Sequence, residues 1–207
     1  MAAIQALLIA VTLTVGTAAA AVDATGRRGY GVLKMLAASG YLALAAHLGA
    51  QDTAYGRLIL VGLMLSWLGD LFLVGRSDRW TLTGLGSFLL AHLAYVAAFL
   101  VLGVDPVPTA AGAVVVAVTA GVALRWLIGR GLPHRMRVPV AIYLLAIGAM
   151  VSLALGTGLP VLAAGAVAFL ASDFLVARQR FVDPSPANRL IGLPLYLAAQ
   201  LLIVSSV

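Results

Sequence analysis

The stretch LSWLGDLFLVGR, Leu65 to Arg76, places a carboxylate, Asp70, inside an apolar run that is long enough to cross a bilayer. A second stretch, FLASDFLVAR from Phe169 to Arg178, does the same with Asp173. An ionised carboxylate in hydrocarbon costs a few kcal/mol, so an acid inside the membrane indicates a functional site. Two such acids predict one shared polar pocket.

The composition of the whole chain is that of an integral membrane protein. Of its 207 residues, 63% are hydrophobic and only 10% are charged, whereas soluble domains carry about 25% charged residues. At about 20 residues per span, the length accommodates about eight helices. We therefore expect an all-α membrane protein with a single transmembrane helical domain over residues 1–207.

Apolar runs and their interruptions predict the individual spans. The segment from Asp105 to Pro108 is expected to break the helical pattern, because proline cannot continue the backbone hydrogen bonding. The longest connection is expected between Gly129 and Pro139. The predicted spans cover about 3–22, 32–49, 57–74, 80–103, a fifth ending near 128, a sixth ending at 156–160, 160–177, and 190 to the last residue.

Basic residues alternate between the predicted connections and give the orientation. Connections one, three, five and seven hold twelve of the thirteen Lys and Arg residues, and only Arg57 lies elsewhere. The positive-inside rule then places the odd-numbered loops in the cytoplasm and both termini outside, in the inner (plasma) membrane. The net charge of +6 follows this topology, so it does not indicate nucleic-acid binding.

Polar residues gather in the predicted cytoplasmic half of the spans. Asp70 and Asp173 each lie five or six residues before the arginines at 76 and 178, about 8 Å inside the boundary at 1.5 Å per residue. We predict that the two acids are catalytic and that the other members of the pocket bind substrate. These expected binding residues are Lys34, His92, Tyr95, Tyr143, Ser172, Tyr196 and Gln200.

A weaker regularity suggests an internal repeat. Asp70 and Asp173 lie half a chain length apart, and Lys34 and Arg137 share that offset. This spacing is typical of two four-helix halves in parallel orientation.

Several residues also allow simpler interpretations. Either acid alone would serve to hold the bundle together, and Lys34 near an interface is most often a residue that reaches to the head groups. A metal bound by Asp70, Asp173 and His92 is an alternative, but the spacing matches no known local signature, and we expect no metal or cofactor. Gly84 and Gly86 are expected to allow close helix packing.

The two acids together favour chemistry. Two carboxyl groups in a pocket of low dielectric cannot both ionise cheaply, so one should keep its proton while the other stays charged. This division supplies both the acid and the carboxylate that acid catalysis with an activated water requires. Proton-coupled transport, or lipid binding without chemistry, would use the same buried acids.

Five motifs in order resemble the lysoplasmalogenase, or YhhN-like, family of multispanning membrane proteins. They are LGD at 68–70, GLGSFLLAHLAYVAAF at 84–99, PVAIY at 139–143, GAVAFLASDFLVARQRF at 165–181 and LYLAAQLLI at 195–203. One departure is Met35, where family members usually carry proline after the lysine. The resemblance implies a lysophospholipid substrate in the bilayer and hydrolysis of its vinyl ether bond to a fatty aldehyde and a glycerophospho-base.

Overall fold

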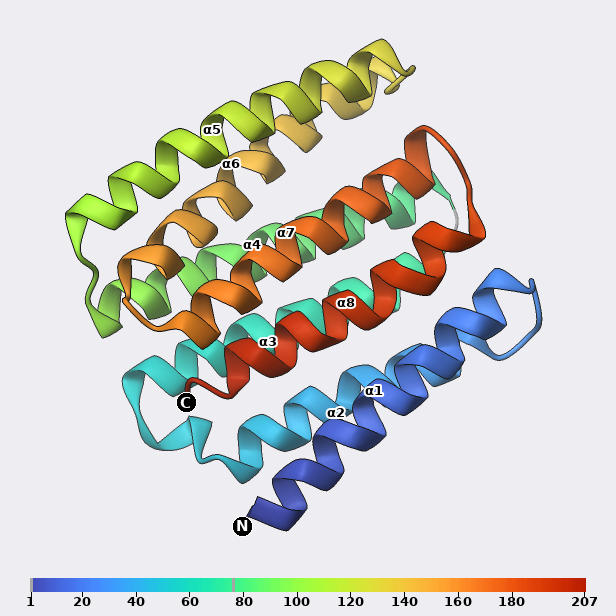
Figure 1. The fold of residues 1–207 in the computed structure, drawn as a ribbon. Helices are drawn as coiled ribbons and strands as arrows, with labels where there is room; N and C mark the ends of the chain where they lie inside the picture. Colours follow the sequence, from blue (N-terminus) through green and yellow to red (C-terminus); the bar gives the residue numbers. More distant parts are fainter. Residues whose placement is uncertain (1, 76) are drawn as a thin grey trace.

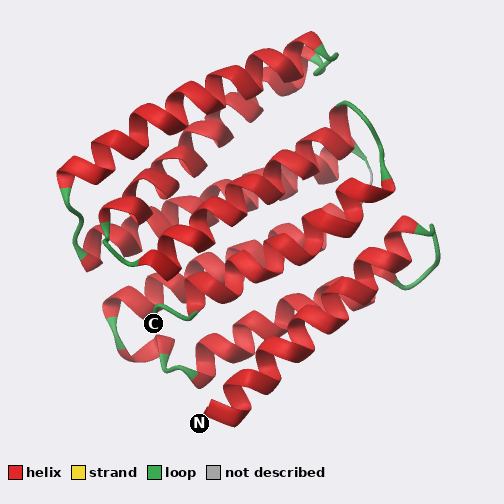
Figure 2. Ribbon diagram, in the orientation of Figure 1, coloured by secondary structure: helices red, strands yellow, loops and turns green. Residues whose placement is uncertain are grey.

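The computed structural model describes residues 2–75 and 77–207 and shows a bundle of eight long helices without strands in that part of the chain (Figures 1 and 2). A short 3-10 turn, η1 (Ala50–Asp52), precedes the third helix. The helices are α1 (Ala2–Ala24), α2 (Tyr30–His47), α3 (Ala54–Val74), α4 (Asp78–Leu102), α5 (Pro106–Gly129), α6 (His134–Gly156), α7 (Pro160–Phe181) and α8 (Pro186–Val204).

Seven of these eight helices are long and apolar enough to span a membrane by length and composition, so the chain is an all-α, multi-pass membrane protein as predicted. The eighth, α2, has only 18 residues and includes Lys34 and His47, which lower its hydropathy. Large apolar side chains such as Val107 and Leu145 point outward and are exposed. This pattern suits a surface in contact with lipid, because lipid tails are as apolar as these side chains.

The predicted boundaries around the prolines need correction. The region 129–139 is not a long connection, because α6 begins at His134 and contains Pro139. Proline lacks the N–H that would bond the carbonyl one turn earlier, which loosens this end of α6 without ending it.

Three other prolines begin helices, and Pro160 begins α7 as predicted. Pro106 lies in the first turn of α5, where its missing N–H costs nothing, and Asp105 caps that turn by accepting a hydrogen bond from Val107 N at 2.8 Å. Pro186 begins α8 in the same way, so that α8 starts before the predicted residue 190.

Consecutive helices form four antiparallel hairpins, α1/α2, α3/α4, α5/α6 and α7/α8 (Figure 1). The two termini lie at one end of the bundle. The connections within the hairpins lie at the other, which we call the arginine-rich end because the basic residues predicted for the odd-numbered loops cluster in and beside these connections. Arg76, which we used to set the depth of Asp70, lies outside the described residues, whereas Arg178 lies in the last turn of α7.

The helix at the centre of the packing is α8, which contacts α1, α2, α3 and α7. The fourth helix, α4, packs against α6, while α5 packs extensively only against α6 within the described chain. The predicted repeat matches most of these neighbours, since α2/α3 corresponds to α6/α7 and α4/α6 to α8/α2. The close contact of α1 with α8 has no comparable α5/α4 counterpart, so the repeat stays a prediction.

Close contact between α3 and α4 depends on small residues. A Cβ added at Gly84 would lie 2.8 Å from Leu73 and 3.3 Å from the carbonyl oxygen of Gly69, so the glycine allows the predicted approach. Gly86 faces open space, and our prediction for it was wrong. The Ser87 hydroxyl adds a hydrogen bond of 2.6 Å to the Leu65 carbonyl across the same contact.

This difference between two glycines in one helix gives a matched test. Gly84→Ala should destabilise the protein by about 1–3 kcal/mol, because its methyl group overpacks the α3/α4 contact. Gly86→Ala should be neutral or stabilising by up to about 1 kcal/mol, because alanine is the better helix former. Thermal unfolding of both variants in detergent checks this, and equal stabilities would contradict the packing described.

Candidate active site

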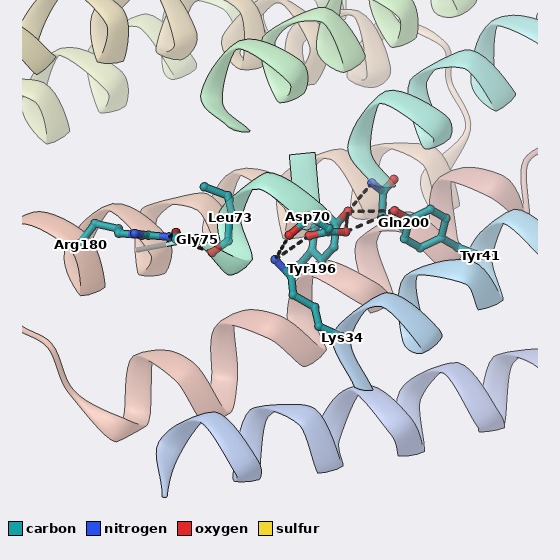
Figure 3. Close-up of polar contacts among 8 residues, drawn as sticks. All are labelled: Lys34, Tyr41, Asp70, Leu73, Gly75, Arg180, Tyr196 and Gln200. Atoms are coloured by element: carbon teal, nitrogen blue, oxygen red, sulfur yellow. Dashed lines mark hydrogen bonds and ion pairs between the residues drawn. The ribbon is translucent and has the colours of Figure 1, made fainter. Parts of the chain in front are cut away.

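Asp70 lies in the last turns of α3 and is the centre of a buried polar network (Figure 3). Its Oδ1 forms an ion pair with Lys34 Nζ of α2 at 2.9 Å, and the same ammonium donates to the Asp70 carbonyl oxygen at 3.2 Å. Asp70 is 2% exposed and Lys34 5%. A buried charge is tolerated when an opposite charge and hydrogen bonds compensate it, so Asp70 is held as a carboxylate.

The second oxygen of Asp70 is held by tyrosine hydroxyls. Tyr196 of α8 donates to Oδ2 at 2.7 Å, and Tyr41 of α2 donates to the same atom at 3.3 Å (Figure 3). Behind them, Gln200 Nε2 donates to the Tyr196 hydroxyl at 3.2 Å, and Tyr95 of α4 donates to Gln200 Oε1 at 2.8 Å. Four helices therefore fix the position of one carboxylate.

Asp173, in α7, has different surroundings. Its Oδ2 accepts a hydrogen bond of 2.5 Å from the Tyr143 hydroxyl of α6. No cation among the described residues lies within ion-pair distance of it. The neighbouring Ser172 is buried, and its hydroxyl donates to the Phe169 carbonyl of its own helix at 2.7 Å. Asp173 therefore differs from Asp70, whose charge an ammonium group compensates.

An aromatic cluster contacts the tyrosines that bind the two acids. Phe88, Phe169 and Tyr196 pack edge to face, with ring centroids 5.3–6.2 Å apart. The ring of His92 packs against Tyr143 at 5.1 Å and Phe169 at 4.9 Å, and neither of its nitrogens has a hydrogen-bond partner. Aromatic faces are electron-rich, so this cluster surrounds the acids with groups that favour a nearby cation.

Both acids line a single cavity of about 1220 Å³. Lys34, Tyr143, Ser172 and Tyr196 line it as well, and most of its remaining wall is apolar. His92, Tyr95 and Gln200 do not line it, so these three expected binding residues lie behind the wall and support residues that do. Among the residues that the structure describes, no three His, Cys, Asp or Glu side chains come close enough to hold a metal ion.

The cavity continues to the arginine-rich end of the bundle, where its lining becomes polar. Arg180 of α7 donates to the carbonyl oxygens of Leu73 and Gly75, and so joins α7 to the end of α3 (Figure 3). It also donates to the Thr81 hydroxyl of α4. Arg189 of α8 donates to the Asp23 carbonyl at 2.9 Å. Both arginines line the mouth of the cavity.

The structure therefore gives some of the predicted residues other roles than we expected, and it adds residues that we did not predict. Lys34, which we expected at a lipid phosphate, is instead the partner of Asp70. Tyr41 was missed, although it lies seven residues after Lys34 and so on the same face of α2. Phe169 and Arg180 were also missed as parts of the site, and their roles depend on contacts between helices that sequence spacing does not give.

Comparison with known proteins gives the family of this chain. The model of the YhhN family matches residues 30–207. The chain belongs to the YhhN family. Its relatives include proteins named lysoplasmalogenase from Mycobacterium bovis and Mycobacterium tuberculosis, each 36% identical over 159 residues, and human TMEM86B, also named lysoplasmalogenase, 32% identical over 174 residues.

Each match covers only part of this chain and only part of the relative. The mycobacterial match covers 72% of this chain and 59% of the relative, and the TMEM86B match covers 84% and 72%. This YhhN family member thus spans less than two thirds of the length of the mycobacterial relatives. No solved structure matches the chain.

The Lys34 and Asp70 pair gives a test by charge removal. Lys34→Met should destabilise the protein by about 3–5 kcal/mol, because it leaves the buried carboxylate uncompensated. Adding Asp70→Asn to that variant should restore most of the loss, because no charge then remains in the site. Unfolding of the single and double variants in detergent measures this coupling. A double variant as unstable as the sum of the two single variants would contradict a direct ion pair.

Proposed function

We propose that the protein hydrolyses the vinyl ether bond of lysoplasmalogen-type lysophospholipids and releases a fatty aldehyde and a glycerophospho-base. One observation carries this proposal: two carboxyl groups line one cavity, one paired with a lysine and the other without a cation among the described residues. The names of the YhhN relatives support the same activity.

The surroundings of the two acids suggest their roles. Asp173, which has no cationic partner in the part of the chain that the structure describes, is the general acid, and Tyr143 orients its carboxyl group. Asp70 remains a carboxylate throughout, because Lys34 and two tyrosine hydroxyls stabilise its charge. Glycosidases divide an acid and a carboxylate in a comparable way around an oxocarbenium ion.

The reaction begins with protonation at carbon. Asp173 transfers its proton to the alkenyl carbon that is not bonded to oxygen, and the remaining carbon and the ether oxygen then share the positive charge. Asp70 and the faces of the aromatic cluster stabilise this cation. Asp173, now a carboxylate, takes a proton from a water molecule as the water oxygen bonds to the cationic carbon.

The product of this addition is a hemiacetal, and Asp173 is again protonated. The hemiacetal then collapses, its hydroxyl proton moves to the ether oxygen, and the bond between carbon and that oxygen breaks. The sum is one vinyl ether and one water giving one aldehyde and one alcohol, with no net change in protons on the protein.

We also propose the orientation that the basic residues indicate. The arginine-rich end faces the cytoplasm and both termini face outward, in the inner (plasma) membrane. The mouth lined by Arg180 and Arg189 then lies at the level of lipid phosphates, which attract basic side chains.

Isotope labelling tests protonation at carbon. Hydrolysis of a lysoplasmalogen in D₂O should give an aldehyde with one deuterium on the carbon next to the carbonyl, and should run more slowly than in H₂O because this proton transfer limits the rate. Mass spectrometry of the trapped aldehyde measures the label. An aldehyde without deuterium would exclude the proposed first step.

Substitution tests the role of Asp173. Asp173→Asn should lower aldehyde release by a factor of about 10²–10⁴, the usual contribution of a general acid. Asp183→Asn is the matched control, because Asp183 pairs with Arg178 at the exposed α7/α8 connection and not in the cavity. A folded Asp173→Asn variant that keeps wild-type turnover would remove the acid from the scheme. Wild-type protein that moves lysolipid across proteoliposomes without releasing aldehyde would favour transport instead.

A further inference from the structure

On the side of the bundle, part of the cavity wall is formed by exposed residues, which indicates a second opening there. Its wall there is formed by Val118 and Val122 of α5 and by Val167 and Phe174 of α7. Val118 and Val122 are 63% and 65% exposed although they line the cavity, and Val167 and Phe174 are exposed as well. We call this opening the α5–α7 window.

The window exists because α5 has few neighbours. It packs extensively only against α6 within the described chain, so its inner face is left toward α7 across the cavity. On α7 the facing residues Val167, Leu170, Ala171 and Phe174 follow helical spacing and form one apolar stripe. The window is therefore apolar on both sides.

The window is closed toward the arginine-rich end. The rings of Trp126 and Phe174 contact each other with centroids 5.6 Å apart. Beyond them, buried Leu127 and Met136 pack with Ala177 and Phe181. The opening thus lies within the membrane-spanning part of α5 and α7, beside hydrocarbon.

We propose that the α5–α7 window holds the alkyl chain of the lysolipid, with its first carbons beside Asp173 and the rest of the chain in the bilayer. The proposal rests on the proposed function for the position of the reactive bond. An apolar wall on both sides and an opening at hydrocarbon depth suit a single aliphatic chain, and the polar mouth at the arginine-rich end suits the head group of the same molecule.

One physical consequence distinguishes this site from a closed pocket. The part of an alkyl chain that extends from the window into the bilayer is surrounded by hydrocarbon both before and after binding. Added CH₂ groups therefore contribute little to the free energy of binding from a bilayer. A closed pocket would instead set an upper limit on chain length. The window therefore predicts that turnover in bilayers varies little among long alkenyl chains.

The test uses two equivalent valines on α5. Val122→Trp fills the window, and Val114→Trp is the control, because Val114 lies two turns away in the same stripe, is 66% exposed and does not line the cavity. Ala171→Trp fills the window from the α7 side and gives a second variant if the first does not fold. Each variant is reconstituted in nanodiscs and given a long-chain lysoplasmalogen and a short, water-soluble vinyl ether.

We expect Val122→Trp and Ala171→Trp to lower turnover of the long-chain lipid about tenfold or more, and to change turnover of the short vinyl ether little. Val114→Trp should resemble the wild type with both substrates. Wild-type turnover of the long-chain lipid by a folded Val122→Trp variant, or equal losses with both substrates, would overturn the window as the chain site.

A binding measurement separates this inference from the proposed hydrolysis. A saturated ether lysolipid has no vinyl bond to cleave, and a ligand that binds the folded state raises the unfolding temperature. It should stabilise the wild type and Val114→Trp in a concentration-dependent way, and Val122→Trp clearly less. If the wild type releases no aldehyde but shows this pattern, the hydrolase proposal fails and the window stands, whereas equal stabilisation of all three proteins overturns the window.

Discussion

The site depends on one constraint, which is that a buried carboxylate needs a nearby cation to compensate its charge. Asp70 has Lys34 at 2.9 Å, and neither residue has more than slight access to the surroundings. The cation reaches this position because α2 packs against α1, α3 and α8, so its polar residues face protein instead of lipid. The helix that is not apolar enough to count as a membrane span by itself therefore packs among its neighbours and carries this cation.

The second acid of the site, Asp173, lies in surroundings that differ from those of Asp70. Asp173 is the same kind of side chain in another helix, but it has a tyrosine hydroxyl in place of an ammonium group. The difference gives two acids with unlike surroundings in one cavity. Aromatic rings pack around the tyrosines that hold the two acids, and such rings would help to stabilise a transient positive charge beside them.

Much of the architecture was predictable from sequence, because long apolar runs and the positions of basic residues are strong signals. The two acids stood out for the same reason, as rare charges in hydrocarbon. Which face of each helix points inward was not predictable, because a helix that is apolar all round carries no stripe to orient it. For this reason the sequence indicated neither Tyr41 beside Asp70 nor the contact of Trp126 with Phe174, and Gly86 was wrongly expected at a helix contact.

The pairing of Lys34 also bears on how the protein would tolerate the aldehyde that the proposed reaction releases. Aldehydes condense with neutral primary amines to form Schiff bases, and Lys34 is the single lysine of the sequence and lines the cavity. Held by Asp70 as an ammonium ion, it has no lone pair with which to attack a carbonyl group. All other basic side chains that carry a permanent charge are arginines. An enzyme of this composition that releases a reactive aldehyde would have almost no side chain that captures the aldehyde.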